Sequence, residues 1–123
     1  MKNLFNITLL CFCILVFSSC TKEGPGGKSA VNGYVSHHNH KIANAVVYIK
    51  YDATEFPGAD VSVYDASVTA DATGYYLIKD LEKGNYYLYG AGYDNAILEN
   101  VVGGIGVKLK RNKTTTTDIP VTE

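Results

Sequence analysis

The chain has few of the residues that build rigid scaffolds or catalytic sites. Its 123 residues include no tryptophan, three prolines, three cysteines and one arginine. The cysteines are Cys11, Cys13 and Cys20, so a disulfide framework cannot hold the remaining sequence together. Eleven basic and twelve acidic residues are scattered along the chain and give a formal net charge of −1. Neither a nucleic-acid partner nor an anionic membrane surface is indicated by this charge pattern.

Sequence motifs of catalysis are missing as well. The chain has no Gly-x-Ser-x-Gly elbow, no His-Glu-x-x-His helix motif and no glycine loop of the kind that holds phosphates. Beyond Cys20 it offers no cysteine nucleophile. We therefore predict a protein that is not an enzyme and that carries no cofactor.

What the chain does have is an N-terminal export pattern. Lys2 precedes an apolar stretch from Ile7 to Phe17, and the small pair Ser18-Ser19 follows. The stretch is shorter than the about 20 residues that a permanent membrane helix needs, but it fits the core of a signal peptide. Residues 1–19 are therefore predicted to be removed, which leaves 104 residues and room for one small domain.

The segment that ends at Cys20 resembles the lipobox of bacterial lipoproteins, although Phe17 stands where many lipoboxes have leucine. The resemblance implies a diacylglycerol-modified Cys20, with the membrane as a partner through this anchor and the cell envelope, most simply the outer membrane, as the location. The alternative is ordinary secretion with Cys20 as an unrelated thiol. The charged pair Lys22-Glu23 leaves open whether the domain faces the periplasm or the cell surface.

After Cys20 the sequence predicts a tether followed by one all-β domain. Residues 20–28 are rich in glycine and contain no apolar side chain to bury, which is typical of a flexible linker. From Ser29 to Glu123 apolar and polar residues alternate with period two, the pattern of β-strands. About seven short strands separated by turns, with Asp71 to Gly74 as one hairpin turn, favour a Greek-key β-sandwich.

The same residues resemble the carboxypeptidase regulatory-like family. The resemblance rests on the segments Gly33-Tyr34-Val35, Ile42 to Ile49, Thr69 to Ile78, Gly84 to Leu88 and Gly92-Tyr93. It implies a transthyretin-like (prealbumin-like) sandwich that serves as a non-catalytic module. Transthyretin-like folds also include a purine-pathway hydrolase, but its C-terminal Tyr-Arg-Gly-Ser motif has no match in this chain, whose single arginine is Arg111.

Two sets of side chains are candidates for metal ligands. His38 and His40 could converge from one side of an extended segment, whereas His37 would point away, and two ligands rarely hold a metal firmly. We expect an exposed loop there and no metal. A calcium cluster would have to come from four aspartates whose spacing matches no known loop and that read as turn residues: Asp52, Asp60, Asp65 and Asp71.

Tyrosine is the notable surface feature, with ten copies in the chain. Strand alternation predicts that Tyr76 and Tyr86 point into the core and that Tyr48, Tyr87 and Tyr89 point outward. If their strands are neighbours, these outward rings form an aromatic face suited to a sugar or a protein partner. The alternative is that tyrosine is simply common in strands. Phe56 lies in a long loop, either as a contact residue at its tip or folded over the end of the sandwich.

Together these features predict a lipid-anchored, non-catalytic β-sandwich of the cell envelope that acts in protein interaction or as a structural component. A carbohydrate-binding protein that uses the tyrosine face is the first alternative, and a transthyretin-like hydrolase is a distant second. Glycan binding needs clustered outward aromatics with polar neighbours, whereas partner docking needs a broader apolar or edge-strand surface.

Overall fold

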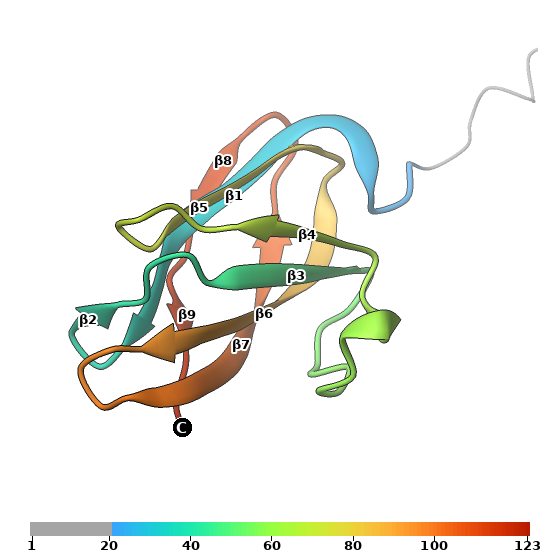
Figure 1. The fold of residues 1–123 in the computed structure, drawn as a ribbon. Coiled ribbons are helices and arrows are strands. Elements are labelled where there is room, and N and C mark those ends of the chain that lie inside the picture. The colour runs from blue at the N-terminus through green and yellow to red at the C-terminus, as the bar shows by residue number, and fades with distance from the viewer. Residues whose placement is uncertain (1–20) are drawn as a thin grey trace, which may run out of the picture.

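The computed structural model describes residues 21–123, so the predicted signal peptide and Cys20 lie outside the described residues. In the described part the chain folds into two β-sheets that pack face to face (Figure 1). None of the helices in residues 21–123 has the length and apolar character needed to cross a membrane. The predicted all-β sandwich is confirmed.

The first sheet is built around one long strand, β1 (Pro25–His37). Two antiparallel neighbours flank it, β2 (His40–Lys41) and β5 (Tyr75–Leu81). Two short C-terminal strands run parallel to β1, namely β8 (Thr114–Thr116) and β9 (Ile119–Pro120). The end of the chain therefore lies against its beginning.

The second sheet has the strand order β4-β3-β6-β7. Its members are β3 (Val46–Tyr51), β4 (Ala66–Thr69), β6 (Gly84–Asp94) and β7 (Glu99–Leu109), all antiparallel. A short 3-10 turn, η2 (Val61–Val63), lies in the loop between β3 and β4. The described residues hold nine strands where we predicted about seven, because β2 and β4 are too short to show a period-two pattern.

The turn at Asp71 to Gly74 does not close a hairpin, contrary to the prediction. It joins β4 of the second sheet to β5 of the first, so it crosses between the sheets. Its local chemistry is as expected: the Asp71 carboxylate accepts hydrogen bonds from the amides of Thr73 (2.8 Å) and Tyr75 (3.1 Å). Gly74 has a φ of 83°, a conformation that favours glycine. Turn chemistry thus located the turn but not the strands that it connects.

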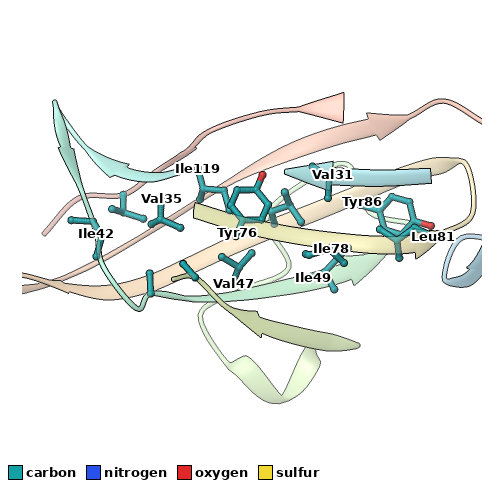
Figure 2. Close-up of a cluster of buried hydrophobic side chains, with 14 of the residues drawn as sticks. Val31, Val35, Ile42, Val47, Ile49, Tyr76, Ile78, Leu81, Tyr86 and Ile119 are labelled. Carbon is teal, nitrogen blue, oxygen red and sulfur yellow. The ribbon is translucent and has the colours of Figure 1, made fainter. Parts of the chain in front are cut away.

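The core lies between the two sheets and confirms the predicted strand phase. Figure 2 shows the buried side chains meeting from both sheets, among them Val31, Val47, Ile49 and Ile119. Tyr76 and Tyr86 point inward, with 1% and 0% of their surface exposed. The Tyr76 hydroxyl donates a hydrogen bond to the Thr117 carbonyl at 2.6 Å, so this buried polar group is satisfied.

The N-terminal segment corrects the predicted tether. Strand β1 begins at Pro25, four residues before the expected start of the domain at Ser29. Before it, the Gly24 amide donates to the Tyr86 hydroxyl at 2.8 Å, and the Glu23 carboxylate accepts from the Asn85 amide at 3.2 Å. Hydrogen bonds between backbone amides and polar side-chain groups hold the segment, which is why a search for buried apolar residues missed it.

Candidate functional site

The three outward tyrosines come from two neighbouring strands, as the aromatic-face hypothesis requires. Strand β3 pairs with β6 so that Tyr48 lies opposite Tyr89 and Lys50 opposite Tyr87. The rings of Tyr48 and Tyr89 have their centroids 6.4 Å apart. The sheet therefore presents Tyr48, Tyr87 and Tyr89 on one outer face.

A loop covers part of this face and turns it into a cluster. From the β3–β4 connection, Tyr64 stacks on Tyr89 with ring centroids 5.6 Å apart and an interplanar angle of 14°. Phe56 contacts Tyr87 at 5.9 Å and Tyr89 at 5.5 Å. As a result only 5% of Tyr89 is exposed, so this ring points outward as predicted but is not free to contact a ligand. We call Tyr48, Phe56, Tyr64, Tyr87 and Tyr89 the aromatic cluster.

The cluster also orders the loop that covers it. The Tyr64 hydroxyl donates a hydrogen bond to the Gly58 carbonyl at 2.9 Å, which ties together two positions of the same loop. Burial raises the pKa of Tyr64 to about 12, with smaller contributions from Tyr87 and Tyr89. Burial likewise raises the pKa of Tyr87. The phenols of Tyr64 and Tyr87 are therefore neutral at physiological pH, and a ligand meets apolar rings with hydroxyl groups.

Phe56 remains the most accessible ring of the cluster. It folds back over the outer face of the sheet, neither at a free loop tip nor over the end of the sandwich, and 52% of its surface is exposed. Beside it lies a hollow of about 440 Å³, which we call the aromatic hollow. Its lining residues are Phe56, Ala59, Tyr87, Tyr89, Val102, Gly103 and Gly104.

Glycines in β7 make room for the rings. A Cβ atom on Gly104 would lie 2.6 Å from the Tyr87 ring and 2.5 Å from the Leu88 carbonyl oxygen. Tyr87 can therefore lie flat across β7 only because residue 104 has no side chain. This cross-strand packing gives the floor of the hollow its shape.

The histidines are arranged differently from the prediction. His38 and His40 are exposed, but His37 is 4% exposed and its Nδ1 donates to the Asp94 carboxylate at 2.8 Å. The second ring nitrogen, Nε2, lies 2.9 Å from a Glu123 carboxylate oxygen, but the geometry is not that of a hydrogen bond. The hydrogen bond from His37 lowers the pKa of Asp94. The expected exposed loop thus contains one buried imidazole, which sequence spacing could not reveal because its carboxylate partners are distant in the chain.

The contact of His37 with Asp94 and Glu123, which we call the latch, is structural. It joins β1 to the end of β6 and to the C-terminal residue, and no group of three potential ligands that could hold a metal occurs in residues 21–123. The aspartates interpreted as turn residues rather than calcium ligands have separate local partners: the Asp60 carboxylate accepts from the Ser62 amide at 3.0 Å, and the Asp65 carboxylate accepts from the Tyr51 amide at 2.7 Å. They do not converge.

Basic side chains that are scattered in sequence meet at one end of the sandwich. Lys28, Lys83 and Arg111 line a cleft of about 240 Å³ together with Glu82. Figure 1 shows the start of the described chain (blue) at the same end as the β7–β8 connection, which carries Arg111. Sequence order concealed this basic end, because its members come from β1 and from two separate connections.

Comparisons with known proteins give the fold and no family. No protein-family model and no curated protein matches the chain. Among solved structures, a DUF3823 family protein from Parabacteroides merdae aligns over 79% of this chain with a TM-score of 0.50 and 16% identity. The aligned part is 47% of that protein, so this chain spans about half its length.

Two further solved structures align less closely. A provisionally named carbohydrate binding protein from Pseudomonas aeruginosa aligns with a TM-score of 0.48 and 14% identity, over 79% of this chain and 90% of the other. The minor pilin of Streptococcus agalactiae aligns with a TM-score of 0.45 and 15% identity, over 81% of this chain and 44% of the other. The two packed sheets of the described residues make the chain a β-sandwich protein, an architecture that it shares with the DUF3823 family protein.

Proposed function

We propose that this chain is a lipid-anchored, non-catalytic module of the bacterial cell envelope that binds a partner protein through the aromatic hollow. The observation that carries the proposal is Phe56, which leaves half of its ring exposed beside an apolar hollow of about 440 Å³. An exposed phenylalanine of this kind is a favourable anchor for a partner, since buried aromatic contacts dominate the binding energy of many interfaces.

The lining of the hollow favours a protein partner over a glycan. Ala59, Val102 and two glycines surround the rings, so the hollow offers few side chains that could hydrogen-bond sugar hydroxyls. It also lies next to β7, which is an edge strand of its sheet. These are the features expected of partner docking. Carbohydrate binding is the second candidate, supported by the exposed ring of Phe56 and by Tyr87 in the lining of the hollow.

The separation of His37 from Arg111 supports a non-catalytic role. The hydrolase alternative needs histidine and arginine side chains in one site. Here His37 is the last residue of the 13-residue strand β1, whereas Arg111 lines a cleft with residues near the beginning of that strand. A strand of this length separates the two by tens of ångströms. We assign the chain to the carboxypeptidase regulatory-like type of module on its sequence resemblance and its β-sandwich architecture.

Membrane anchoring is proposed from the pattern Lys2, Ile7 to Phe17 and Cys20. The scattered charges of the sequence indicate no anionic surface, but the fold gathers Lys28, Lys83 and Arg111 at the end where the described chain begins, and this basic end would face anionic headgroups beside the anchor. Replacing Cys20 by alanine is expected to abolish lipid labelling and to release the protein from membranes. A Cys20→Ala protein that is still acylated and membrane-bound would refute the anchor.

The binding role is tested by co-purification from native envelopes with a matched pair of variants. Phe56→Ala is expected to lose the partner protein while the fold is retained. Leu77→Ala serves as the control, because Leu77 is 44% exposed but lies on β5 of the other sheet. Loss of an envelope polysaccharide instead of a protein would favour the glycan alternative. Equal recovery of partners by both variants would refute a role for the hollow.

A further inference from the structure

The outer edge of strand β7, which faces away from β6, is hydrogen-bonded over only part of its length. Near its N-terminal end, Val102 exchanges two hydrogen bonds with Thr122, with both N–O distances 2.9 Å. The amide and the carbonyl of Val102 therefore point away from β6, toward the C-terminal segment. Beyond this bridge the C-terminal segment no longer accompanies the strand, because Ile119 and Pro120 pair with β1.

The remaining backbone directions follow from the regular pairing of β7 with β6. The register is continuous from Asp94↔Glu99 to Gly84↔Leu109, without a bulge. In an antiparallel ladder, successive residues turn their amide and carbonyl groups alternately toward and away from the neighbouring strand. Since Val102 points away from β6, Gly104, Gly106 and Lys108 do so too. Among the backbone hydrogen bonds that residues 21–123 make outside their regular strand ladders, none engages these three residues.

Two grooves lie on either side of this open edge. On the outer face is the aromatic hollow, with Gly104 in its floor. On the inner side is a groove of about 560 Å³ lined by Ser36, His38, Ile105, Asp118, Pro120 and Val121. Side chains of an added strand alternate between the two faces of the sheet, so successive residues would enter the two grooves in turn.

We propose that the edge from Gly104 to Lys108 captures an extended segment of the partner protein by strand addition. This inference rests on the proposed function and names its binding mode. Three pairs of backbone hydrogen bonds fix the segment, and apolar side chains in the two grooves provide specificity. The matching segment has an acidic residue near Lys108, whose ammonium group is exposed at the end of the open edge.

Charge argues for a different protein as the occupant rather than a second copy of this chain. Residues 100–113 contain no carboxylate, and Lys108, Lys110 and Arg111 all lie at the end of β7 or directly after it. Glu99, the one carboxylate of β7, lies beyond the bridge at Val102, so pairing the open edge from Gly104 to Lys108 with its own copy would place no acidic partner opposite these cations. A heterologous strand with an acidic end satisfies both the backbone groups and the charge.

Proline substitution tests the backbone contacts. The Lys108 amide points away from β6, so Lys108→Pro removes no hydrogen bond of the sheet but blocks an added strand. Lys108→Thr changes the charge and keeps the amide. The matched control is Ser67→Pro on β4, the opposite edge strand of the same sheet. Tyr48 directs its amide and carbonyl to Tyr89 of β6, so its other neighbour, Ser67, has its own amide and carbonyl pointing away from β3.

The probe is a phage-displayed library of random linear peptides, selected on the purified protein and then measured as single peptides. Selected sequences are expected to alternate apolar residues and to carry an acidic end. Lys108→Pro should weaken binding at least about tenfold and Lys108→Thr less than about fivefold, while Ser67→Pro should have no effect. Thermal melting of each variant identifies any loss that comes from unfolding.

Amide hydrogen exchange tests the edge itself, even if a variant is unstable. In the free protein the amides of Gly104, Gly106 and Lys108 should exchange fast, and the selected peptide should protect them. Slow exchange of all three in the free protein would overturn the proposal, as would concentration-dependent protection that shows self-pairing. Peptides that lose binding to Phe56→Ala but not to Lys108→Pro would overturn strand addition and leave the proposed function intact.

Discussion

The hydroxyl group of Tyr86 is predicted to hold the N-terminal segment on the domain. The ring is fully buried and packs edge-to-face with Tyr51, with centroids 5.9 Å apart. Its oxygen accepts a hydrogen bond from the Gly24 amide at 2.8 Å and donates one to the Glu82 carbonyl at 2.7 Å. Tyr86→Phe keeps the ring and removes both bonds.

We expect Tyr86→Phe to lower the free energy of unfolding by about 1–3 kcal/mol, because the buried Gly24 amide then has no partner. Tyr86→Ala should cost about 3–5 kcal/mol, since the cavity of the missing ring is added. The measurement is urea unfolding, together with hydrogen exchange at Gly24 and Asn85, which should become faster in Tyr86→Phe.

Tyr87→Phe is the control for this pair. Tyr87 is the next residue on β6, half-buried, and its hydroxyl makes no hydrogen bond within residues 21–123, so a change below about 0.5 kcal/mol is expected. If Tyr87→Phe were more damaging than Tyr86→Phe, the strand phase would be wrong. If Tyr86→Phe left Gly24 as protected as before, the N-terminal segment would not depend on this hydroxyl.

Three further predictions concern the latch, the aromatic cluster and the glycines of β7. The hydrogen bond from His37 lowers the pKa of Asp94, so its contribution to stability is present above the unfolded pKa of about 4 and is lost in acid. Urea unfolding should show a smaller acid loss in Asp94→Asn, and equal losses would contradict the latch. Burial raises the pKa of Tyr64 to about 12, so stability should fall as the pH rises above about 10, and less so in Tyr64→Phe. Tyrosinate absorbance that shows Tyr64 titrating near 10 would contradict its burial. Gly104→Ala should destabilise by about 1–3 kcal/mol, because the added Cβ would lie 2.6 Å from the Tyr87 ring, whereas Lys108→Ala should be nearly neutral. Equal stability of these two variants would show that Tyr87 does not lie across β7.

The core and the strand phase were predictable from sequence because both depend on local alternation. Val31, Val47, Tyr76 and Tyr86 are buried as their positions in period-two patterns indicate. The order of the predicted tether was not predictable, because it is held by hydrogen bonds of the Glu23 carboxylate and the Gly24 amide, which leave no apolar signal in the sequence.

The candidate site was predictable only in part, because some of its contacts join distant segments. Alternation placed Tyr48, Tyr87 and Tyr89 on one face, but not the loop that brings Tyr64 onto Tyr89. The period-two pattern of strands does not predict where a loop lies. Tyr89 is buried because that loop covers it, so its burial was not predictable. The contact of His37 with Asp94 likewise spans 57 residues of sequence. Phe56 in the long loop was the sequence signal for the covering loop, and it left open whether the ring lies at the loop tip or over the end of the sandwich.

The central claim is that one outer edge of this sandwich, the aromatic hollow with the adjoining β7, is a binding surface. Amide NMR during titration with a peptide selected on the protein tests it most directly. The account predicts that the shifting residues centre on Phe56, Val102, Gly104 and Gly106, while Leu77 and Tyr34 on the other sheet remain unchanged. Shifts centred on Leu77 and Tyr34, with Phe56 and β7 unmoved, would contradict it.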